Sequence, residues 1–273
     1  MTRLVDLYEM QRVYEELTAA FRQNEGRLSE ELYQHIVSKH TTLFENSETL
    51  FLLLQASGYP IEKEGKEYYL LTHDTPYQQQ KFCVVDIETN GSKPEHSQII
   101  EVGAVMIQNG KIIDRFESFV ECAFVPECIT KVTGIIPEDL MGAPSHLEVL
   151  TQLRVFLDDA VFVAHNASFD YGFLNYSFDR FGLGTIGNPK LCSIDLAKRT
   201  IESKRYGLAY LNEFLEIGTK VHHRAYSDAL TTAQVLLIAF QNLPSYIKTT
   251  DELIRFSVSN RKVRTQKRDK SSK

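Results

Sequence analysis

The chain has 273 residues, of which 43% are hydrophobic and 24% are charged, and its formal net charge is −6. These values are typical of a globular protein with a substantial core, and they exclude collagen-like, disordered and disulfide-stapled proteins. An acidic chain is not an obvious binder of nucleic acid, so a phosphate-binding site would need a local source of positive charge. No apolar run approaches the roughly 20 residues of a membrane-spanning helix, and the first ten residues lack the apolar core of a secretory signal. The four cysteines show no CxxC spacing, so we expect reduced thiols in a cytoplasmic protein that does not bind a membrane.

Residues 1–79 form the first predicted unit, a small and mainly helical domain with 7 basic and 13 acidic side chains. Apolar residues at helical spacing predict a first helix, and Ser29 and Ser47 are candidate N-caps of two more. Residues 61–71, with Gly65 at a polar turn, predict a hairpin. Three helices and a hairpin are similar to a winged-helix module, although a compact helical cap or partner-docking domain is the simpler interpretation. The excess of acidic residues disfavours duplex DNA as a ligand.

Strands and helices alternate in the second predicted unit, residues 80–243. Three tightly joined strands are followed by strands alternating with helices, so we expect an α/β fold with a mixed five-stranded sheet flanked by helices. A C-terminal helix is expected within residues 244–259. Residues 260–273 contain seven basic side chains and are most simply a disordered tail, with nucleic acid or polymerase binding as the alternative. The predicted strands are residues 82–87, 99–107, 111–119, 161–165 and 190–194, and the predicted helices are residues 146–157, 169–181, 195–201, 208–215 and 225–240.

Four carboxylates are the candidate functional groups of this unit. Asp86 and Glu88 lie at the end of its first strand, and side chains two apart on a strand point to the same face. Buried like charges repel, so such a pair is costly unless a cation neutralises it. Asp170 and Asp228 each lie in the first turn of a predicted helix, where an acid also occurs for ordinary reasons. Because strand ends and helix starts converge on one crevice in α/β sheets, we expect the four acids to meet.

Several segments of this unit match one family in order, spacing and predicted secondary structure. They are residues 86–89, 100–104, 133–135, 165–170 and 206–208, together with His223 and Asp228. With these motifs the chain resembles the DEDDh 3′–5′ exonucleases of the ribonuclease H-like fold, and in pattern the epsilon proofreading subunits of bacterial DNA polymerase III. The resemblance covers roughly residues 81–243. It implies a ribonuclease H-like fold and a metal-dependent hydrolase that releases nucleoside monophosphates from DNA 3′ ends, proofreading for a replicative DNA polymerase.

The resemblance also implies a set of metal ligands. Asp86 would bridge two divalent ions, Mg²⁺ or Mn²⁺. Glu88 and Asp228 would complete the ion site on the side of the attacking water, and Asp170 would support the second ion. Hard cations prefer carboxylate oxygens, and a pair of ions can clamp the attacking and leaving oxygens of a phosphodiester. The ions would also supply the positive charge that the acidic chain lacks.

By the same resemblance, His223 would be the general base, since a histidine can accept a proton at neutral pH. The residues themselves leave two alternatives open. His165 precedes Asp170 by five residues, the spacing that also separates His223 from Asp228, and His222 is adjacent.

Substrate contacts are implied for Ile87, Thr89, Asn166 and Phe169, which match positions that receive the 3′-terminal nucleotide in this family; Phe169 also fits as a core residue. We therefore expect single-stranded DNA 3′ ends as the substrate. The acids do not distinguish DNA from RNA, so an RNA 3′-end trimming exoribonuclease or oligoribonuclease is the alternative function. An inactive scaffold that binds nucleic acid or polymerase is the non-enzyme alternative, which the presence of all four acids and the histidine disfavours.

Overall fold

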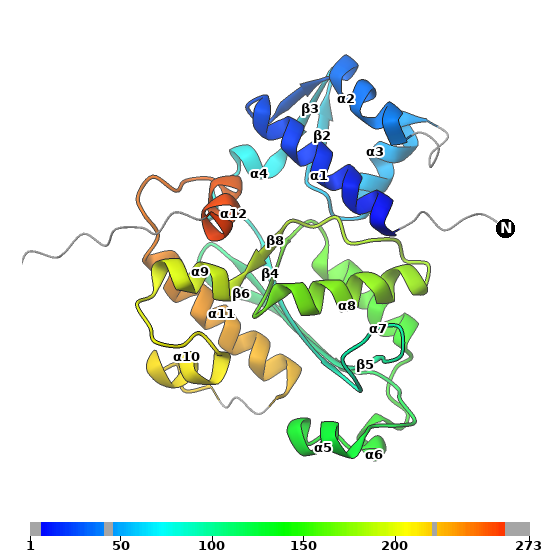
Figure 1. The fold of residues 1–273 in the computed structure, drawn as a ribbon, viewed down its shortest axis with the longest axis vertical. Helices are drawn as coiled ribbons and strands as arrows, with labels where there is room; N and C mark the ends of the chain where they lie inside the picture. The colour runs from blue at the N-terminus through cyan, green and yellow to red at the C-terminus, as the bar shows by residue number, and fades with distance from the viewer. Residues whose placement is uncertain (1–6, 41–45, 220–222, 260–273) are drawn as a thin grey trace, which may run out of the picture.

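The computed structural model of the chain describes residues 7–40, 46–219 and 223–259. A small N-terminal domain lies beside a larger α/β domain, and helix α12 (Thr250–Val258) lies near the junction of the two (Figure 1). The basic tail from residue 260 onward and His222 both lie outside the described residues. Within the described ranges, no helix combines the length and the apolar character needed to cross a membrane.

The N-terminal domain combines helices with a small antiparallel sheet of order β1-β3-β2. Ser29 caps the second helix, as predicted, by accepting the N–H of Leu32. The third helix is capped by Asn46 and not by the predicted Ser47, because the Asn46 side chain accepts the N–H of Thr49. Strand β1 was not predicted, since three residues are too few to show an alternation of apolar and polar side chains. The elements are α1 (Leu7–Gln23), β1 (Arg27–Ser29), α2 (Glu30–Val37), a 3₁₀ turn (Ser38–His40), α3 (Ser47–Ala56), β2 (Ile61–Glu64), β3 (Glu67–Leu70) and α4 (Leu71–Asp74).

The larger domain contains the expected mixed five-stranded sheet, of order β6-β5-β4-β7-β8. Strands β4, β5 and β6 pair antiparallel, whereas β7 and β8 run parallel to β4. The short helices α5 and α6 were not predicted from the sequence. The elements are β4 (Phe82–Thr89), β5 (Ile99–Gln108), β6 (Lys111–Phe119), α5 (Glu127–Thr133), α6 (Pro137–Leu140), α7 (His146–Leu157), β7 (Val161–Ala164), α8 (Ala167–Arg180), β8 (Lys190–Cys192), α9 (Ser193–Thr200), α10 (Leu208–Phe214) and α11 (Ala225–Gln241).

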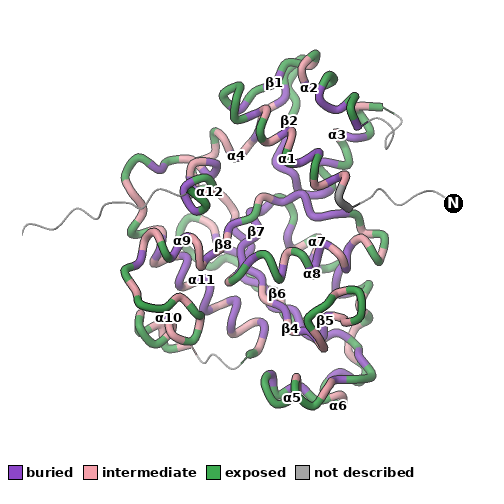
Figure 2. The backbone as a smooth tube through the Cα atoms, viewed as in Figure 1, coloured by how far each residue is buried: buried purple, intermediate pink, exposed green. Residues whose placement is uncertain are grey.

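The central strand β4 separates two hydrophobic cores. Cys83, Val85 and Ile87 pack in the core that contains residues of α7 and α8, whereas Phe82 and Val84 pack in the core that contains residues of α9, α11 and α12. Strands β4, β5 and β7 are therefore largely buried (Figure 2), whereas the edge strand β6 is mostly exposed. Because side chains alternate along a strand, the next residues on the α11 face of β4 are the two predicted carboxylates.

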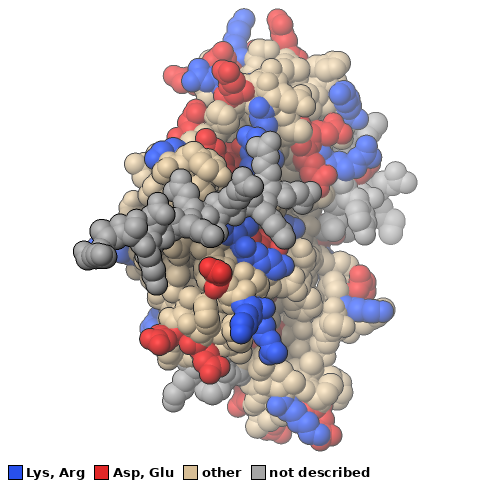
Figure 3. Space-filling model, turned by 60° about the vertical axis from the view of Figure 1, so that its left-hand side comes forward, with Lys and Arg blue, Asp and Glu red and all other residues tan. Residues whose placement is uncertain are grey.

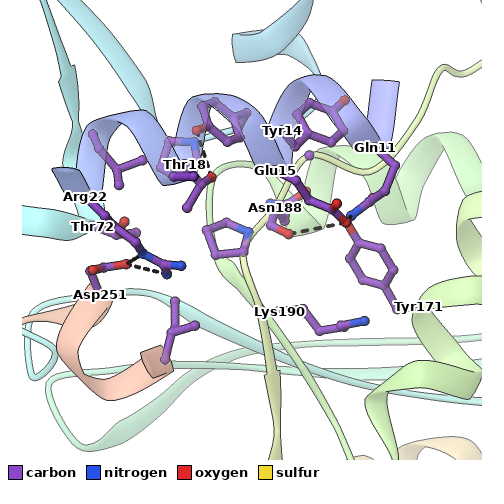
Figure 4. A pocket seen from close by; sticks show the side chains of 17 residues that line it. Gln11, Tyr14, Glu15, Thr18, Arg22, Thr72, Tyr171, Asn188, Lys190 and Asp251 are labelled. Carbon is purple, nitrogen blue, oxygen red and sulfur yellow. Dashed lines mark hydrogen bonds and ion pairs between the residues drawn. The ribbon is translucent and has the colours of Figure 1, made fainter. Parts of the chain in front are cut away.

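The two domains contact each other between α1 and the loop before β8. At one end, Arg22 Nη2 lies 2.6 Å from Asp251 Oδ1 of α12 (Figure 4). At the other end, the hydroxyl groups of Tyr14 and Thr185 are 2.7 Å apart. A pocket of about 270 Å³ lies at this junction, so the space between the two domains is incompletely filled.

Candidate active site

The α11 face of β4 and β5 changes from apolar to polar along its length. At one end it presents Val84 and Val105, which pack beneath α11. Toward the other end, Asp86 is the register partner of Gly103, and Glu88 is the partner of Glu101. The period of the strands thus brings several carboxylates to one end of the face that β4 and β5 present to α11.

Gly103 lets α11 approach this polar end closely. A Cβ atom at position 103 would overlap the backbone of Ala225 and Tyr226 at the start of the helix. Glycine is therefore required here by close approach of two backbones. This contact sets the distance between the first turn of α11 and the acids of β4.

Asp228 and His223 reach the carboxylates from the start of α11. Asp228 lies in the first turn and is 6% exposed. His223 precedes the helix in a left-handed backbone conformation, with φ 51°, and its side chain is exposed. One ligand atom each of Glu88, His223 and Asp228 lie within 4.8 Å of one another, a spacing that suits a shared metal ion.

Asp170 joins the site from the first turn of α8, on the side of β4 that faces β7. The ladder between β4 and β7 extends only to Val84, and α8 begins shortly after β7 ends. The Ile87 N–H donates to Asp170 Oδ1 at 3.3 Å, which ties this buried carboxylate to the strand that carries Asp86 and Glu88. The four predicted acids thus come from three elements that are far apart in sequence.

The pKa values of these acids reflect a buried concentration of negative charge. Burial raises the pKa of Asp86 well above its ordinary value, and the carboxylates of Asp170 and Asp228 raise it further. Burial, followed by repulsion from Asp228, raises the pKa of Glu88 to about 8. Burial raises the pKa of Asp170 to about 7, against the opposing effect of its backbone hydrogen bonds. Carboxylates with these properties fit a bound cation, which would neutralise them at neutral pH.

His165, the alternative base, has both ring nitrogens engaged away from this cluster. Nδ1 lies 2.8 Å from the Ser193 hydroxyl, and Nε2 lies 2.9 Å from the Tyr206 carbonyl oxygen. Burial lowers the pKa of His165 to about 4, so the ring is neutral, donating from Nε2 and accepting at Nδ1. These hydrogen bonds position the loop before α10. Among the residues that the structure describes, His223 is the histidine that lies beside the acids.

The four predicted substrate-binding residues lie beside the acids along β4 and α8. Ile87 and Thr89 are buried, and the Thr89 hydroxyl donates to the Gly91 carbonyl oxygen at 2.8 Å. Asn166 is exposed at the N-cap of α8 in a left-handed conformation, with φ 77°. Phe169, in the turn that carries Asp170, is 39% exposed, so the structure does not place it in the core.

Sequence reasoning assigned no role to the pair formed by Glu101 and Arg224. Arg224 Nη2 and Nε donate to Glu101 Oε1 at 2.7 and 3.0 Å, and the Ala225 N–H donates to Oε2 at 3.0 Å. Glu101 is only 1% exposed. Two features of the sequence could have indicated this pair. Glu101 is a single acid in an apolar strand, and Arg224 directly follows the predicted base, but the two lie 123 positions apart in the sequence.

Comparison with known proteins gives the family of this chain. The RNase T exonuclease model matches residues 83–236, which is more than half of the chain. The chain belongs to this exonuclease family. Membership places it among nuclease hydrolases, and the match contains all four acids and His223.

Relatives of this exonuclease include much longer proteins. The PolC-type DNA polymerase III of Halalkalibacterium halodurans is 40% identical over 163 residues, covering 59% of this chain and 11% of the relative. The PolC-type DNA polymerase III of Caldanaerobacter subterraneus subsp. tengcongensis is 39% identical over 176 residues, covering 63% of this chain and 12% of the relative. The chain therefore spans about a ninth of the length of these curated relatives.

A solved structure shows the same fold. The zinc-bound complex of E. coli ExoI with single-stranded DNA gives a TM-score of 0.55 at 16% identity, covering 62% of this chain and 42% of that chain. Together with the sheet order, this likeness supports the ribonuclease H-like architecture expected from the sequence.

Proposed function

We propose that this chain is a divalent-metal-dependent 3′–5′ exonuclease that hydrolyses single-stranded DNA from its 3′ end and releases nucleoside monophosphates. The observation that carries the proposal is the approach of Glu88, His223 and Asp228 to within 4.8 Å of one another. Asp170 accepts the Ile87 N–H of β4 at 3.3 Å, and the carboxylates of Asp170, Asp228 and Glu88 all act on Asp86. A base and a set of cation ligands in one place are what phosphodiester hydrolysis requires.

The donor set fits hard divalent cations, because it consists of carboxylate oxygens. In this proposal Asp86 would be shared between two ions, Glu88 and Asp228 would complete the ligand set of the ion beside the attacking water, and Asp170 would support the other. Bound Mg²⁺ or Mn²⁺ would offset the charge that develops on the scissile phosphate and on the attacking and leaving oxygens. The raised pKa values imply that the acids give up their protons when cations bind.

His223 is the proposed general base. It accepts a proton from the water whose oxygen attacks the phosphorus that joins the last two nucleotides. The bond between that phosphorus and the 3′ oxygen of the penultimate nucleotide then breaks, and this leaving oxygen takes up a proton from solvent. The products are a nucleoside monophosphate and a strand shortened by one nucleotide. Because the His223 side chain is exposed, it can pass the proton on to solvent.

Ile87, Thr89, Asn166 and Phe169 are the proposed contacts of the 3′-terminal nucleotide. Thr89 follows Glu88 directly, and Phe169 directly precedes Asp170, so both lie next to proposed ligands. The exposed Phe169 ring offers a surface on which a base can stack.

A DNA substrate and a proofreading role are supported by the relatives. Two of them are named as PolC-type DNA polymerase III, and the ExoI structure is a complex with single-stranded DNA. We propose that this chain trims 3′ ends made by a replicative DNA polymerase, with that polymerase as its partner. All four cysteines are free thiols, which is compatible with the proposed cytoplasmic location.

The test is degradation of single-stranded DNA and RNA of one sequence, each labelled at the 5′ end, by the full chain with Mn²⁺. We expect DNA products shortened stepwise from the 3′ end, no cleavage in EDTA, and no cleavage by Glu88→Gln. Glu95→Gln, which changes an exposed acid outside the cluster, is the matched control and should retain activity. A strong preference for RNA would favour an exoribonuclease, and no nucleotide release with Mn²⁺ would favour an inactive scaffold.

For residues 1–79 we propose a winged-helix-like module that docks a protein partner and does not bind duplex DNA. Its chain order, α1–β1–α2–α3–β2–β3, supports the first part. Helix α3 contains no Lys or Arg and exposes Leu52 and Leu53, which is unlike a helix that reads a DNA groove. Acidic and basic side chains are interspersed over the face shown in Figure 3. The test is the double variant Lys63→Ala with Lys66→Ala, which removes both lysines of the hairpin. Its affinity for labelled duplex DNA, measured in EDTA, should equal that of the wild-type chain. A clear loss of affinity would contradict this proposal.

A further inference from the structure

We infer that Glu101, acting through Arg224, is a positioning residue that holds His223 against the acids of β4. The inference rests on the proposed role of His223 as the base. The Glu101 carboxylate accepts hydrogen bonds from Arg224 Nη2 at 2.7 Å and Nε at 3.0 Å, and from the Ala225 N–H at 3.0 Å. Arg224 is the residue directly after His223, so the anchor is one peptide bond from the proposed base.

Glu101 supplies the N-terminal cap that α11 lacks in its own sequence. The N-cap residue of α11 is Arg224, and its side chain makes no capping hydrogen bond to the helix. The first helical N–H, that of Ala225, is bound instead by Glu101 from strand β5. A negative group at the start of a helix also suits the helix dipole. The start of α11 is therefore fixed to the sheet and not only to the rest of the helix.

The anchor acts on a histidine whose backbone conformation is uncommon. His223 has φ 51°, a left-handed conformation that few residues other than glycine adopt. Because Arg224 is held in an extended conformation, with φ −124°, the direction of the chain leaving His223 is set by the Glu101 pair. Such conformations persist where surrounding contacts determine them.

The register of the sheet connects this anchor to the proposed metal ligands. Glu101 is the direct partner of Glu88 across β4 and β5. Glu88 is thus connected to His223 in three steps: the strand pairing with Glu101, the ion pair of Glu101 with Arg224, and the peptide bond before Arg224. A displacement of about 1 Å in a reacting group can lower a rate about 100-fold, so a path this short is suited to keeping the base in place.

Arginine suits this position better than lysine for two reasons. Its planar guanidinium binds both oxygens of one carboxylate, whereas a lysine ammonium does not form this bidentate contact. Its guanidinium also lies 5.1 Å from the centre of the Phe119 ring, which fixes its plane. Arg224→Lys therefore keeps the charge that offsets Glu101 but loses the geometry of the anchor.

The test compares Arg224→Lys and Glu101→Gln with the wild-type full chain, on single-stranded DNA with Mn²⁺. For both variants we expect kcat to fall about 10- to 100-fold, with KM for DNA unchanged. The Mn²⁺ concentration dependence should stay unchanged in Arg224→Lys, whereas Glu101→Gln also removes a negative charge opposite the proposed ligand Glu88 and should shift it. The matched control is Arg115→Lys, because Arg115 lies over the Tyr226 ring of the same helix, 5.9 Å from its centre, and has no link to His223. Its kcat should stay within about twofold of wild type, since lysine keeps a cation that can lie over the same ring at this exposed position.

A second comparison separates an effect on His223 from an effect on the fold or the metal ligands. In a His223→Ala background, measured under single-turnover conditions with enzyme in excess, Arg224→Lys should cause no further loss. An equal loss in both backgrounds would overturn the inference, as would wild-type kcat in Arg224→Lys. An inactive wild-type chain would instead contradict the proposed function. If Glu101→Gln does not fold, Arg224→Lys decides the question, because it keeps the charge and hydrophobic stem of the residue.

Discussion

Gly103 on β5 is the direct register partner of Asp86 on β4, and the backbone of α11 packs against Gly103 so closely that no side chain fits. One glycine thus sets how near the helix carrying Asp228 comes to the strand carrying Asp86. A similar contact further along the sheet would have no catalytic consequence, but here it lies at the end where the carboxylates meet.

Gly103→Ala should therefore lower both stability and activity. The added methyl group meets backbone atoms of Ala225 and Tyr226, which cannot rotate away, so the start of α11 must shift. We expect a loss of about 1–3 kcal/mol in the free energy of unfolding, measured by urea titration. We also expect a fall in kcat of at least about 10-fold, because the helix start also carries His223 and Asp228.

Gly172→Ala is the matched control for this substitution. Gly172 lies in α8, has an ordinary helical conformation, and has open space where a Cβ atom would be placed. Alanine there should leave activity unchanged and raise stability slightly, since alanine favours the helix. If Gly103→Ala behaved like Gly172→Ala, the close approach would not be what positions α11.

His223→Ala should remove nearly all turnover while binding of DNA and Mn²⁺ persists. General bases typically contribute about 10²- to 10⁴-fold to a rate. The measurement is kcat for single-stranded DNA, with DNA affinity measured in parallel by fluorescence anisotropy. Retention of more than about a tenth of the wild-type rate would show that another group takes the proton.

His165→Ala should show the opposite pattern. Its ring is held by Ser193 and the Tyr206 carbonyl, so we expect a loss of about 1–3 kcal/mol in the free energy of unfolding. Any fall in activity should follow the folded fraction, and restoring folding at lower temperature should restore most of the rate. A folded variant without turnover would instead place His165 in the chemistry.

The stability of the metal-free protein should fall as pH rises from about 4 to about 8. Glu88 has an ordinary pKa of 4.5 and a folded-state pKa of about 8, and Asp170 has corresponding values of 3.8 and about 7. Between these values the folded protein binds more protons than the unfolded chain, so raising the pH favours unfolding. Mn²⁺ requires the deprotonated acids, and it should therefore raise the Tm more at pH 8 than at pH 6.

Both effects can be measured as the Tm of thermal unfolding at several pH values, once in EDTA and once in Mn²⁺. The comparison is with Glu88→Gln, which removes one titrating acid and one proposed ligand and should show a smaller dependence on both pH and Mn²⁺. An equal rise in Tm at pH 6 and pH 8 for the wild-type protein would contradict the link between metal binding and deprotonation.

The sequence predicted most of the sheet and the set of acids because these depend on local patterns. Alternation along β4 was enough to place Asp86 and Glu88 on one face. Asp170 and Asp228 are ordinary helix-start acids by local pattern, and the expected convergence of strand ends and helix starts, together with the family resemblance, was needed to group them with the other two. The anchor between Glu101 and Arg224 depends on how α11 lies over β5, which no local pattern encodes. His165 and His223 have the same spacing to an acid, so the residues alone left both open. The resemblance favoured His223, and the hydrogen bonds of His165 are consistent with that choice. Helices α5 and α6 are too short to show a helical repeat of apolar residues.

Phe169→Ala should raise KM for single-stranded DNA by about 10-fold, with a smaller effect on kcat. A base stacked on an aromatic ring is worth about 1–3 kcal/mol, and 1.4 kcal/mol corresponds to a factor of ten. Phe173 is the comparison, because its ring contacts that of Phe169, with centroids 5.9 Å apart, but is buried. Phe173→Leu should lower the free energy of unfolding without changing KM. An unchanged KM in Phe169→Ala would remove Phe169 from the nucleotide site.

The most direct measurement is anomalous diffraction from a crystal of the full chain soaked in Mn²⁺. We predict anomalous peaks from manganese ions bound by the carboxylates of Asp86, Glu88, Asp170 and Asp228. Crystals of Asp86→Asn should show no such peaks. No anomalous peak among these four acids, or manganese bound only at exposed acids elsewhere, would contradict the proposed metal site.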